Sequence, residues 1–132
     1  MANDAAAIGS ALYSAIGGAG TVVGVNLYYG LAPQGSAPPY AIFQRQDALD
    51  DYRFGDYRDV STDYVVKVVS NRGFPTEART HYERFDTALQ DASLSVSGFQ
   101  LIRCRRMTQI EYRDGDGFWH CGGIFRVDIH KT

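Results

Sequence analysis

The sequence has little net charge and little cysteine, and each shortage excludes a class of protein. Of its 132 residues, 13 are Lys or Arg and 15 are Asp or Glu, which gives a formal net charge of −2. A chain with this balance has no overall positive field that would draw it to nucleic acid or to an anionic membrane. Its two cysteines, Cys104 and Cys121, match no metal-binding or redox spacing.

The sequence also has neither the pattern of a signal peptide nor a long apolar run. No Lys or Arg precedes Arg45, so the positive beginning of a signal peptide is missing. The small-residue run over 5–20 is interrupted by glycines and is shorter than the roughly 20 apolar residues of a membrane span. We therefore expect one domain over residues 1–132, made in the cytoplasm and not inserted in a membrane.

Catalytic and metal-binding patterns are missing as well. The histidines His81, His120 and His130 are not expected to converge, and neither Cys-x-x-Cys nor His-x-x-x-His occurs. No Gly-x-Ser-x-Gly motif marks a nucleophile. The glycines at 17–20 follow a predicted helix, whereas a phosphate-binding loop precedes one. The sequence thus predicts no catalytic residue, no metal site and no cofactor.

The apolar residues that are present predict an α+β fold. Spacings of three and four indicate a helix over 4–16 and a second helix that begins near Pro75. The strands indicated by alternating and β-branched residues are 22–31, 40–46, 61–70, 99–112 and 118–130. We expect a mostly antiparallel β-sheet with 61–70 near its centre and the two helices packed on one face.

The last two predicted strands flank Asp114-Gly115-Asp116-Gly117, which is a strong hairpin signal. A register with Arg113 opposite Phe118 puts the apolar residues of both strands on one face. The residues of the first strand that this register assigns to the core are Ile102, Cys104, Ile110 and Tyr112. It separates the two cysteines by about 20 Å along the sheet, so we expect both thiols to be buried and unpaired.

The chain is organised around residues 26–44, where two predicted strands flank a proline-rich loop. The three prolines of this loop fix φ and remove amide donors, so the loop is stiff without ladder hydrogen bonds. A stiff exposed loop between strands is more often a contact device than a catalytic one. The residues expected to contact a neighbouring subunit or a partner protein here are Tyr29, Pro33, Gln34, Pro38 and Pro39.

Charged residues gather in two complementary patches. The stretch 47–59 interleaves Asp and Arg with aromatic residues and keeps no apolar period, which predicts a long, mobile loop. The stretch 103–106 carries three arginines on a predicted strand. Opposite charges favour self-association, while solvated strand charges and a grip on phosphate are the alternatives. The residues expected to make the subunit contact are Asp50, Asp51, Arg53, Arg105 and Arg106.

Two segments carry a family resemblance: LYYGLAPQG at 27–35 and PPYAIFQ at 38–44. They are similar to the signature of the small tail-completion or tail-terminator proteins of long-tailed bacteriophages and related gene-transfer particles. In that family an N-terminal helix precedes the segment, and a strand, an amphipathic helix and a C-terminal strand hairpin follow it. The order predicted here resembles that order from end to end.

The resemblance implies a structural protein without catalytic residues, which forms a ring that is usually hexameric. Such a ring caps the assembled tail tube, stops its polymerisation and offers the joining surface for the head. The implied partners are other copies of the chain, the tail tube protein and the head connector or stopper protein, with DNA passing through without specific binding. The implied location is the junction of tail and neck in the virion, after assembly in the host cytoplasm.

Two other functions stay open from the sequence alone. One is a different neck component, such as a head-completion protein or a connector adaptor. The other is a nucleic-acid-binding module that would use Arg103, Arg105, Arg106 and Arg126, although no stacking aromatic residues are arranged around them. An enzyme is the least favoured function.

Overall fold

The computed structural model describes residues 4–16, 25–52, 58–94, 96 and 98–131. Within these residues the chain forms two helices and five strands. In chain order they are α1 (Asp4–Ala15), β1 (Asn26–Tyr29), β2 (Tyr40–Tyr52), β3 (Arg58–Ser70), α2 (Thr76–Leu89), β4 (Phe99–Arg113) and β5 (Trp119–Lys131).

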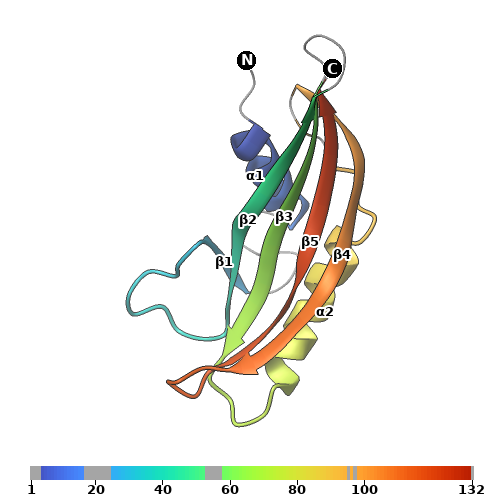
Figure 1. The fold of residues 1–132 in the computed structure, drawn as a ribbon. Coiled ribbons are helices and arrows are strands. Elements are labelled where there is room, and N and C mark those ends of the chain that lie inside the picture. The colour runs from blue at the N-terminus through green and yellow to red at the C-terminus, as the bar shows by residue number, and fades with distance from the viewer. Residues whose placement is uncertain (1–3, 17–24, 53–57, 95, 97, 132) are drawn as a thin grey trace.

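The five strands form one sheet in the order β1-β2-β3-β5-β4 (Figure 1). β1 runs parallel to β2, and the other neighbouring pairs are antiparallel. β3 occupies the middle of the sheet, as its apolar character predicted. The expected α+β fold with a mostly antiparallel sheet is confirmed.

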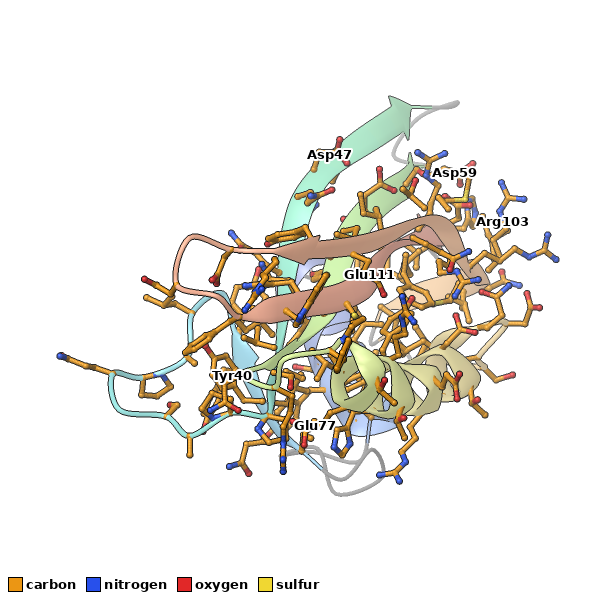
Figure 2. All side chains as sticks on the ribbon, turned by 90° about the horizontal axis from the view of Figure 1, so that it is seen from below. Tyr40, Asp47, Asp59, Glu77, Arg103 and Glu111 are labelled. Carbon is orange, nitrogen blue, oxygen red and sulfur yellow. The ribbon has the colours of Figure 1, made fainter. Side chains whose placement is uncertain are left out.

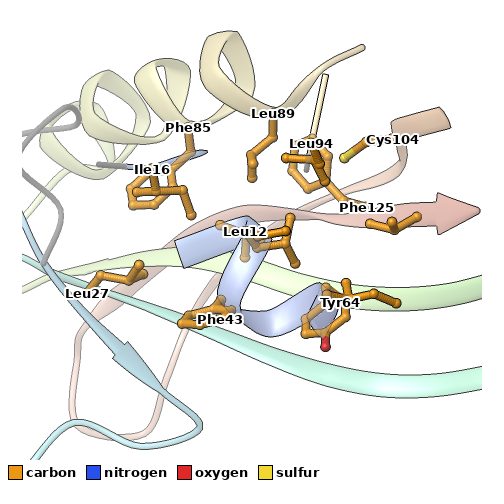
Figure 3. Close-up of a cluster of buried hydrophobic side chains, with 14 of the residues drawn as sticks. Leu12, Ile16, Leu27, Phe43, Tyr64, Phe85, Leu89, Leu94, Cys104 and Phe125 are labelled. Carbon is orange, nitrogen blue, oxygen red and sulfur yellow. The ribbon is translucent and has the colours of Figure 1, made fainter. Parts of the chain in front are cut away.

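Both helices cover the same face of the sheet, as expected (Figure 3). α1 packs Ile8, Leu12 and Ile16 onto it, and all three are fully buried because they recur every three or four residues on one side of the helix. The buried residues of α2 follow the same spacing and are Ala78, Tyr82, Phe85 and Leu89. Pro75 is the N-cap residue of α2, and no side-chain hydrogen bond caps this end.

The core lies between this helix layer and the sheet. β3 contributes Tyr64 and Val66, and β5 contributes Phe125 and Val127, all at most 1% exposed. Burying a large apolar side chain of this kind stabilises a protein by about 1.5–3 kcal/mol relative to leaving it in water. The helix-covered face therefore supplies most of the favourable free energy of folding.

The predicted long loop over 47–59 is wrong. β2 and β3 both extend into it and pair with each other as far as Tyr52 opposite Arg58. The ladder hydrogen bonds come from the backbone, so an acidic stretch without an apolar period still forms a hairpin when it continues two paired strands. Residues 53–57 lie outside the described part of the chain.

The predicted register of β4 and β5 is right in the middle of the hairpin and wrong at its ends. Cys104 pairs with Val127 as predicted, but Arg113 pairs with Trp119, so the connecting loop is one residue longer than expected. The pairing shifts at two β-bulges in β4, one near residue 102 and one near residue 107.

These bulges also correct the predicted core of β4. Cys104 is buried as expected, whereas Ile102 and Tyr112 are exposed and Ile110 is half-buried. A bulge adds one residue to one strand only, and the side chains that follow then turn to the other face. A prediction that assumes strict alternation along the whole strand therefore assigns the residues after a bulge to the wrong face.

Cys104 and Cys121 are buried and unpaired, as the predicted register implied. They pair across the hairpin with Val127 and Glu111, well separated along the strands. Burial raises the pKa of each thiol to about 12, and at Cys121 the neighbouring Glu111 adds to this effect. The neutral thiols act as small apolar side chains of the core.

Candidate assembly surface

The predicted basic cluster is paired with carboxylates of the same chain. The ion pairs, with their nitrogen to oxygen distances, are Arg103–Asp128 at 2.6 Å, Arg105–Asp91 at 2.9 Å, Arg106–Asp86 at 3.0 Å and Arg126–Asp63 at 2.9 Å. Hydrogen bonds to Asp63 raise the pKa of Arg126 above its ordinary value. Each guanidinium thus already has a carboxylate partner in its own chain, which reduces the net positive charge that the cluster offers to a phosphate backbone.

Two arginines predicted at a subunit contact lie on different faces of β4. Arg105 pairs with Arg126 on the open face, which is the face opposite the helices, and its side chain is 55% exposed. Arg106 lies on the helix-covered face, where it binds Asp86 of α2 and is 28% exposed. Its backbone N–H donates to the Gln90 side chain at 2.9 Å. Arg106 thus connects α2 to the sheet, and Arg105 is the better candidate for an external contact.

The proline arm, residues 30–39, joins β1 to β2 and projects from the sheet (Figure 1). Gly30 begins it with a φ of 77°, a left-handed conformation that glycine adopts without strain. A turn follows in which the Ser36 N–H donates to the Pro33 carbonyl at 3.1 Å. Gly35, with a φ of 85°, occupies the position of this turn that requires a positive φ. The Gly30 N–H still donates to the Phe43 carbonyl of β2 at 3.0 Å, and the turn then gives the arm internal order beyond this last bond to the sheet.

An aromatic cluster holds the base of the arm. Tyr29, the last residue of β1, packs edge to face on Phe43 with 5.0 Å between ring centroids. Phe43 in turn lies 6.4 Å from the rings of Tyr13 in α1 and Tyr64 in β3. The Tyr29 hydroxyl accepts the Arg45 backbone N–H at 3.4 Å, yet the residue stays 57% exposed. A ring that is anchored on one side and exposed on the other suits a protein contact.

The structure places the predicted contact residues on two sides of the sheet. Those in or beside β1, the arm and β2 are Tyr29, Pro33, Gln34, Pro38, Pro39, Asp50 and Asp51. Arg105 and Arg106 lie in β4, and β3 and β5 separate this strand from β2. The strands that carry the predicted acidic and basic residues are therefore not neighbours in the sheet. Arg53 lies outside the described residues.

Sequence reasoning missed several large apolar side chains that are exposed. They are Tyr13, Leu31, Phe74, Ile102, Met107 and Tyr112. Leu31 was predicted as the last residue of the strand 22–31, but β1 ends at Tyr29. Gly30 and Pro33 were a usable signal for this earlier end, because both residues disfavour a strand. Ile102 and Tyr112 carried no such signal, because the bulges of β4 turn them away from the core face that the predicted register gave them. Met107 carried a signal, because that register put it on the face opposite the core.

The two histidines of β5 each pair with a carboxylate, and these pairs lie apart. No group of three or more His, Cys, Asp or Glu side chains among the described residues is placed to hold a metal ion. His120 pairs with Asp114 at 2.7 Å, and His130 pairs with Asp59 at the other end of β5. Among the helices in this part of the chain, none is both long and apolar enough to cross a membrane.

Comparison with known proteins bears on both the family and the fold. The family model described as Tail completion protein gp17 matches residues 6–129. The chain belongs to this family. Among solved structures, a chain of the virion of a native gene transfer agent particle matches with a TM-score of 0.83 and 18% identity, over 98% of this chain and 99% of that chain. At this identity the likeness shows a shared fold, and a comparison with curated proteins finds no match.

Membership in the tail completion family confirms the resemblance carried by residues 27–44. It makes the chain a structural protein of a phage tail, located in the virion and in contact with other virion proteins. The arm and β4 both carry exposed apolar side chains, among them Leu31 and Met107.

Proposed function

We propose that this tail completion protein forms a ring that caps the tail tube, ends tail polymerisation and joins the tail to the head connector. Family membership supports a place where the tail is completed. The observation that carries the proposal is the proline arm, which projects from the sheet and exposes 82% of Leu31 (Figure 1). An exposed apolar side chain on an ordered projection gains free energy only when a partner covers it.

The arm has the properties of a binding element. Aromatic residues such as Tyr29 carry much of the energy of protein contacts. The prolines and the turn at Gly35 restrict the free arm to few conformations, so binding costs less conformational entropy than it would for a flexible loop. The residues that we assign to a contact with a neighbouring subunit or with the tube are Tyr29, Pro33, Gln34, Pro38 and Pro39.

The proposed ring is hexameric, with the tail tube on one side and the head connector or stopper on the other. DNA passes through it without specific binding. The pairing of Arg103, Arg105 and Arg126 with carboxylates of the same chain supports this, because paired arginines release few counterions from DNA.

Negative-stain imaging of the protein mixed with its purified tail tube tests the proposal. We expect annular caps at one end of the tubes and no growth of capped tubes. Deleting residues 34–37 should preserve the circular dichroism spectrum and the Tm, because these residues lie outside the helices and strands. The deletion should lower the number of capped tubes about tenfold, as the loss of a contact of about 1.4 kcal/mol does.

Phe74→Ser is the matched control, because Phe74 is also apolar and highly exposed but lies outside the arm. This variant should cap tubes as the wild type does. A wild-type protein that leaves tubes uncapped and binds purified head connectors would overturn the proposal in favour of a head-completion protein or connector adaptor. If the deletion unfolds the chain, Leu31→Ser gives the same test with one exposed side chain changed.

A further inference from the structure

Exposed apolar side chains gather at two opposite edges of the sheet. The first group, the arm-side patch, is Tyr13, Tyr29 and Leu31. The second group, the β4 patch, is Ile102, Met107 and Tyr112. β1 and β4 are the outer strands in the sheet order, so the two patches lie on opposite sides of the molecule (Figure 1). Among the described residues, Phe74 is the large exposed apolar residue that belongs to neither.

The strand register places the arm-side patch at the height of Met107 and Tyr112 of the β4 patch, whereas Ile102 lies about 23 Å further along β4. The row of paired residues through the end of β1 is, strand by strand, Tyr29, Phe43, Val66, Gly123 and Gln109. Gln109 lies between Met107 and Tyr112 along β4. Two copies that stand side by side in the same orientation therefore bring the arm-side patch of one next to the β4 patch of the other.

Charged residues match in the same way further along the strands. β1 pairs with β2 only as far as Phe43, so beyond this residue β2 is the free edge of the described sheet. The row through the acidic part of β2 is Asp47, Asp63, Arg126 and Arg105. Paired residues share a face, so Asp47 at one edge and Arg105 at the other both belong to the open face. Figure 2 shows Asp47 on β2 and Arg103, two residues before Arg105, on β4.

The arginines of β4 keep donors for a second carboxylate. The Arg105 Nε donates to Asp91 at 2.9 Å, and the Arg103 Nε donates to Asp128 at 2.6 Å. A guanidinium has five N–H donors in a planar fork, so donors remain on each of these side chains. Both arginines are about half exposed. Asp47 of a neighbouring copy can therefore reach them from the solvent side.

Side chains rather than added strand pairing carry the contact at this charged end. The Cys104 carbonyl accepts the Asp91 N–H at 2.8 Å, and the Arg106 N–H donates to the Gln90 side chain at 2.9 Å. The connector between α2 and β4 thus occupies the outer edge of β4 at these residues. An edge whose backbone groups are bonded in this way is protected from pairing with another strand.

We propose that the arm-side edge of one copy binds the β4 edge of the next copy, with the arm-side patch on the β4 patch and Asp47 facing Arg105. The two surfaces differ, so the contact is heterologous, and each copy keeps one free surface of each kind until a ring closes. The apolar residues supply affinity, and the charged row sets the orientation. This contact deepens the proposed ring function, on which it rests, by assigning the two surfaces that close the ring.

Cross-linking with a short bis-maleimide tests the contact on the full chain mixed with its tail tube. Leu31→Cys and Met107→Cys should give no dimers when each is used alone, and their mixture should give dimers. A chain that carries both substitutions should give a ladder of cross-linked species up to the complete ring. The native Cys104 and Cys121 are buried, so the folded wild type should not react.

The matched control for cross-linking is Phe74→Cys, which is as exposed as Leu31→Cys but lies at neither edge. It should form no dimers with either edge variant. Asp47→Cys mixed with Arg105→Cys provides a second pair at the charged row, so the test does not depend on position 31 alone.

Charge exchange gives an independent readout. Arg105→Glu should lower the fraction of capped tubes about tenfold at low salt, because like charges across a contact are unfavourable by at least about 1.4 kcal/mol. Adding Asp47→Arg to the same chain should restore capping. Repair of the intrachain pair cannot explain this rescue, because the partner of Arg105 within its own chain is Asp91.

Three outcomes would overturn the assignment, and they are distinguishable. Dimers of Leu31→Cys alone would replace the head-to-tail contact with an isologous one. If capped tubes and annular particles form but neither cysteine pair cross-links, the assigned contact surfaces are wrong and the proposed ring is still supported. A wild type that forms neither caps nor rings would remove the proposed function as well.

Discussion

The two faces of the central strand β3 are held in different ways, although their residues alternate along one chain segment. Toward the helices, Tyr64, Val66 and Val68 are at most 1% exposed. On the open face, Asp63 and Lys67 are half-buried and bind side chains of β5 and β4. One face is therefore covered by the two helices, whereas cross-strand polar pairs hold the other.

This difference separates stability from assembly. Apolar area removed from water stabilises the helix-covered face by about 25 cal/mol per Å². Exposed ion pairs of the kind found on the open face contribute about 0–1 kcal/mol each. We expect substitutions on the helix-covered face to lower stability, and substitutions on the open face and at the sheet edges to affect contacts with other molecules.

The largest expected loss of stability comes from one position on the open face, contrary to this general expectation. Gly122 pairs with Lys67, and a Cβ on Gly122 would lie 2.2 Å from the Val66 carbonyl oxygen and 2.6 Å from the Lys67 Cα. These are backbone atoms of the central strand, so Gly122→Ala should lower the free energy of unfolding by about 3 kcal/mol, the upper part of the range for overpacking.

Urea unfolding measures this effect, with Gly115→Ala as the matched control. Nothing lies within 4 Å of a Cβ at Gly115, which stands in the hairpin turn, so this substitution should leave stability nearly unchanged. Equal stability of Gly122→Ala and the wild type would contradict the close approach of β3 and β5.

An intermediate effect on stability is expected when the same substitution is made at two adjacent positions of β3, one on each face of the sheet. Val66 is fully buried under the helices, and Val65 is half-buried on the open face. Val66→Ala should cost about 2 kcal/mol, from two methyl groups at about 0.8 kcal/mol each and the cavity that they leave. Val65→Ala should cost less than about 1 kcal/mol. Similar losses in chemical denaturation of the two variants would show that the open face is as well covered as the other.

The smallest expected effect is a pH dependence of stability that arises from Asp114 in the hairpin turn. Hydrogen bonds from His120 and from the backbone N–H groups of Phe118 and Asp116 lower the pKa of Asp114 from its ordinary value of 3.8. A folded pKa below the unfolded one stabilises the protein above pH 3.8, and this contribution is lost as the pH falls through the folded pKa. Asp114→Asn should therefore destabilise the protein more at pH 7 than at pH 3. Unfolding curves that show the same difference at both pH values would contradict this coupling.

Periodicity in the sequence was enough to find the helices and strands whose apolar residues are buried along the whole element. The predicted apolar stripe of α2 includes Tyr82, Phe85 and Leu89, and all three are buried. The same holds for Phe125 and Val127 of β5. These elements pack against the core along their whole length. Their apolar residues therefore recur with the period of the helix or strand backbone.

The same reasoning failed toward the outside of the sheet. Ile102 and Tyr112 of β4 have the alternation of core residues, but two bulges turn them outward. The acidic half of β2 has no alternation at all and still pairs with β3 up to Tyr52. In both places the conformation depends on the strand that pairs with the segment. The sequence of one strand does not show where its partner lies.

The candidate surface was predictable only in part. The prolines and glycines of 30–39 were sufficient to recognise a stiff exposed loop, because their effect on φ is local. The alternation of side chains along a strand was enough to put Arg105 and Arg106 on opposite faces of β4. The sequence alone did not turn Tyr112 away from the core, because this follows from the bulge that lies between Arg106 and Thr108.

By itself the sequence determined the α+β class, the exposed loop between β1 and β2, the absence of recognisable catalytic motifs and the signature of the tail completion family. These properties depend on residues that are close together in the chain. The tertiary structure alone decided that the row through Tyr29 ends at Gln109, close to Met107 on the opposite edge, and that Asp47 and Arg105 share a row. That match is a sum of strand registers, and each register depends on bulges and loop lengths that only the assembled sheet sets.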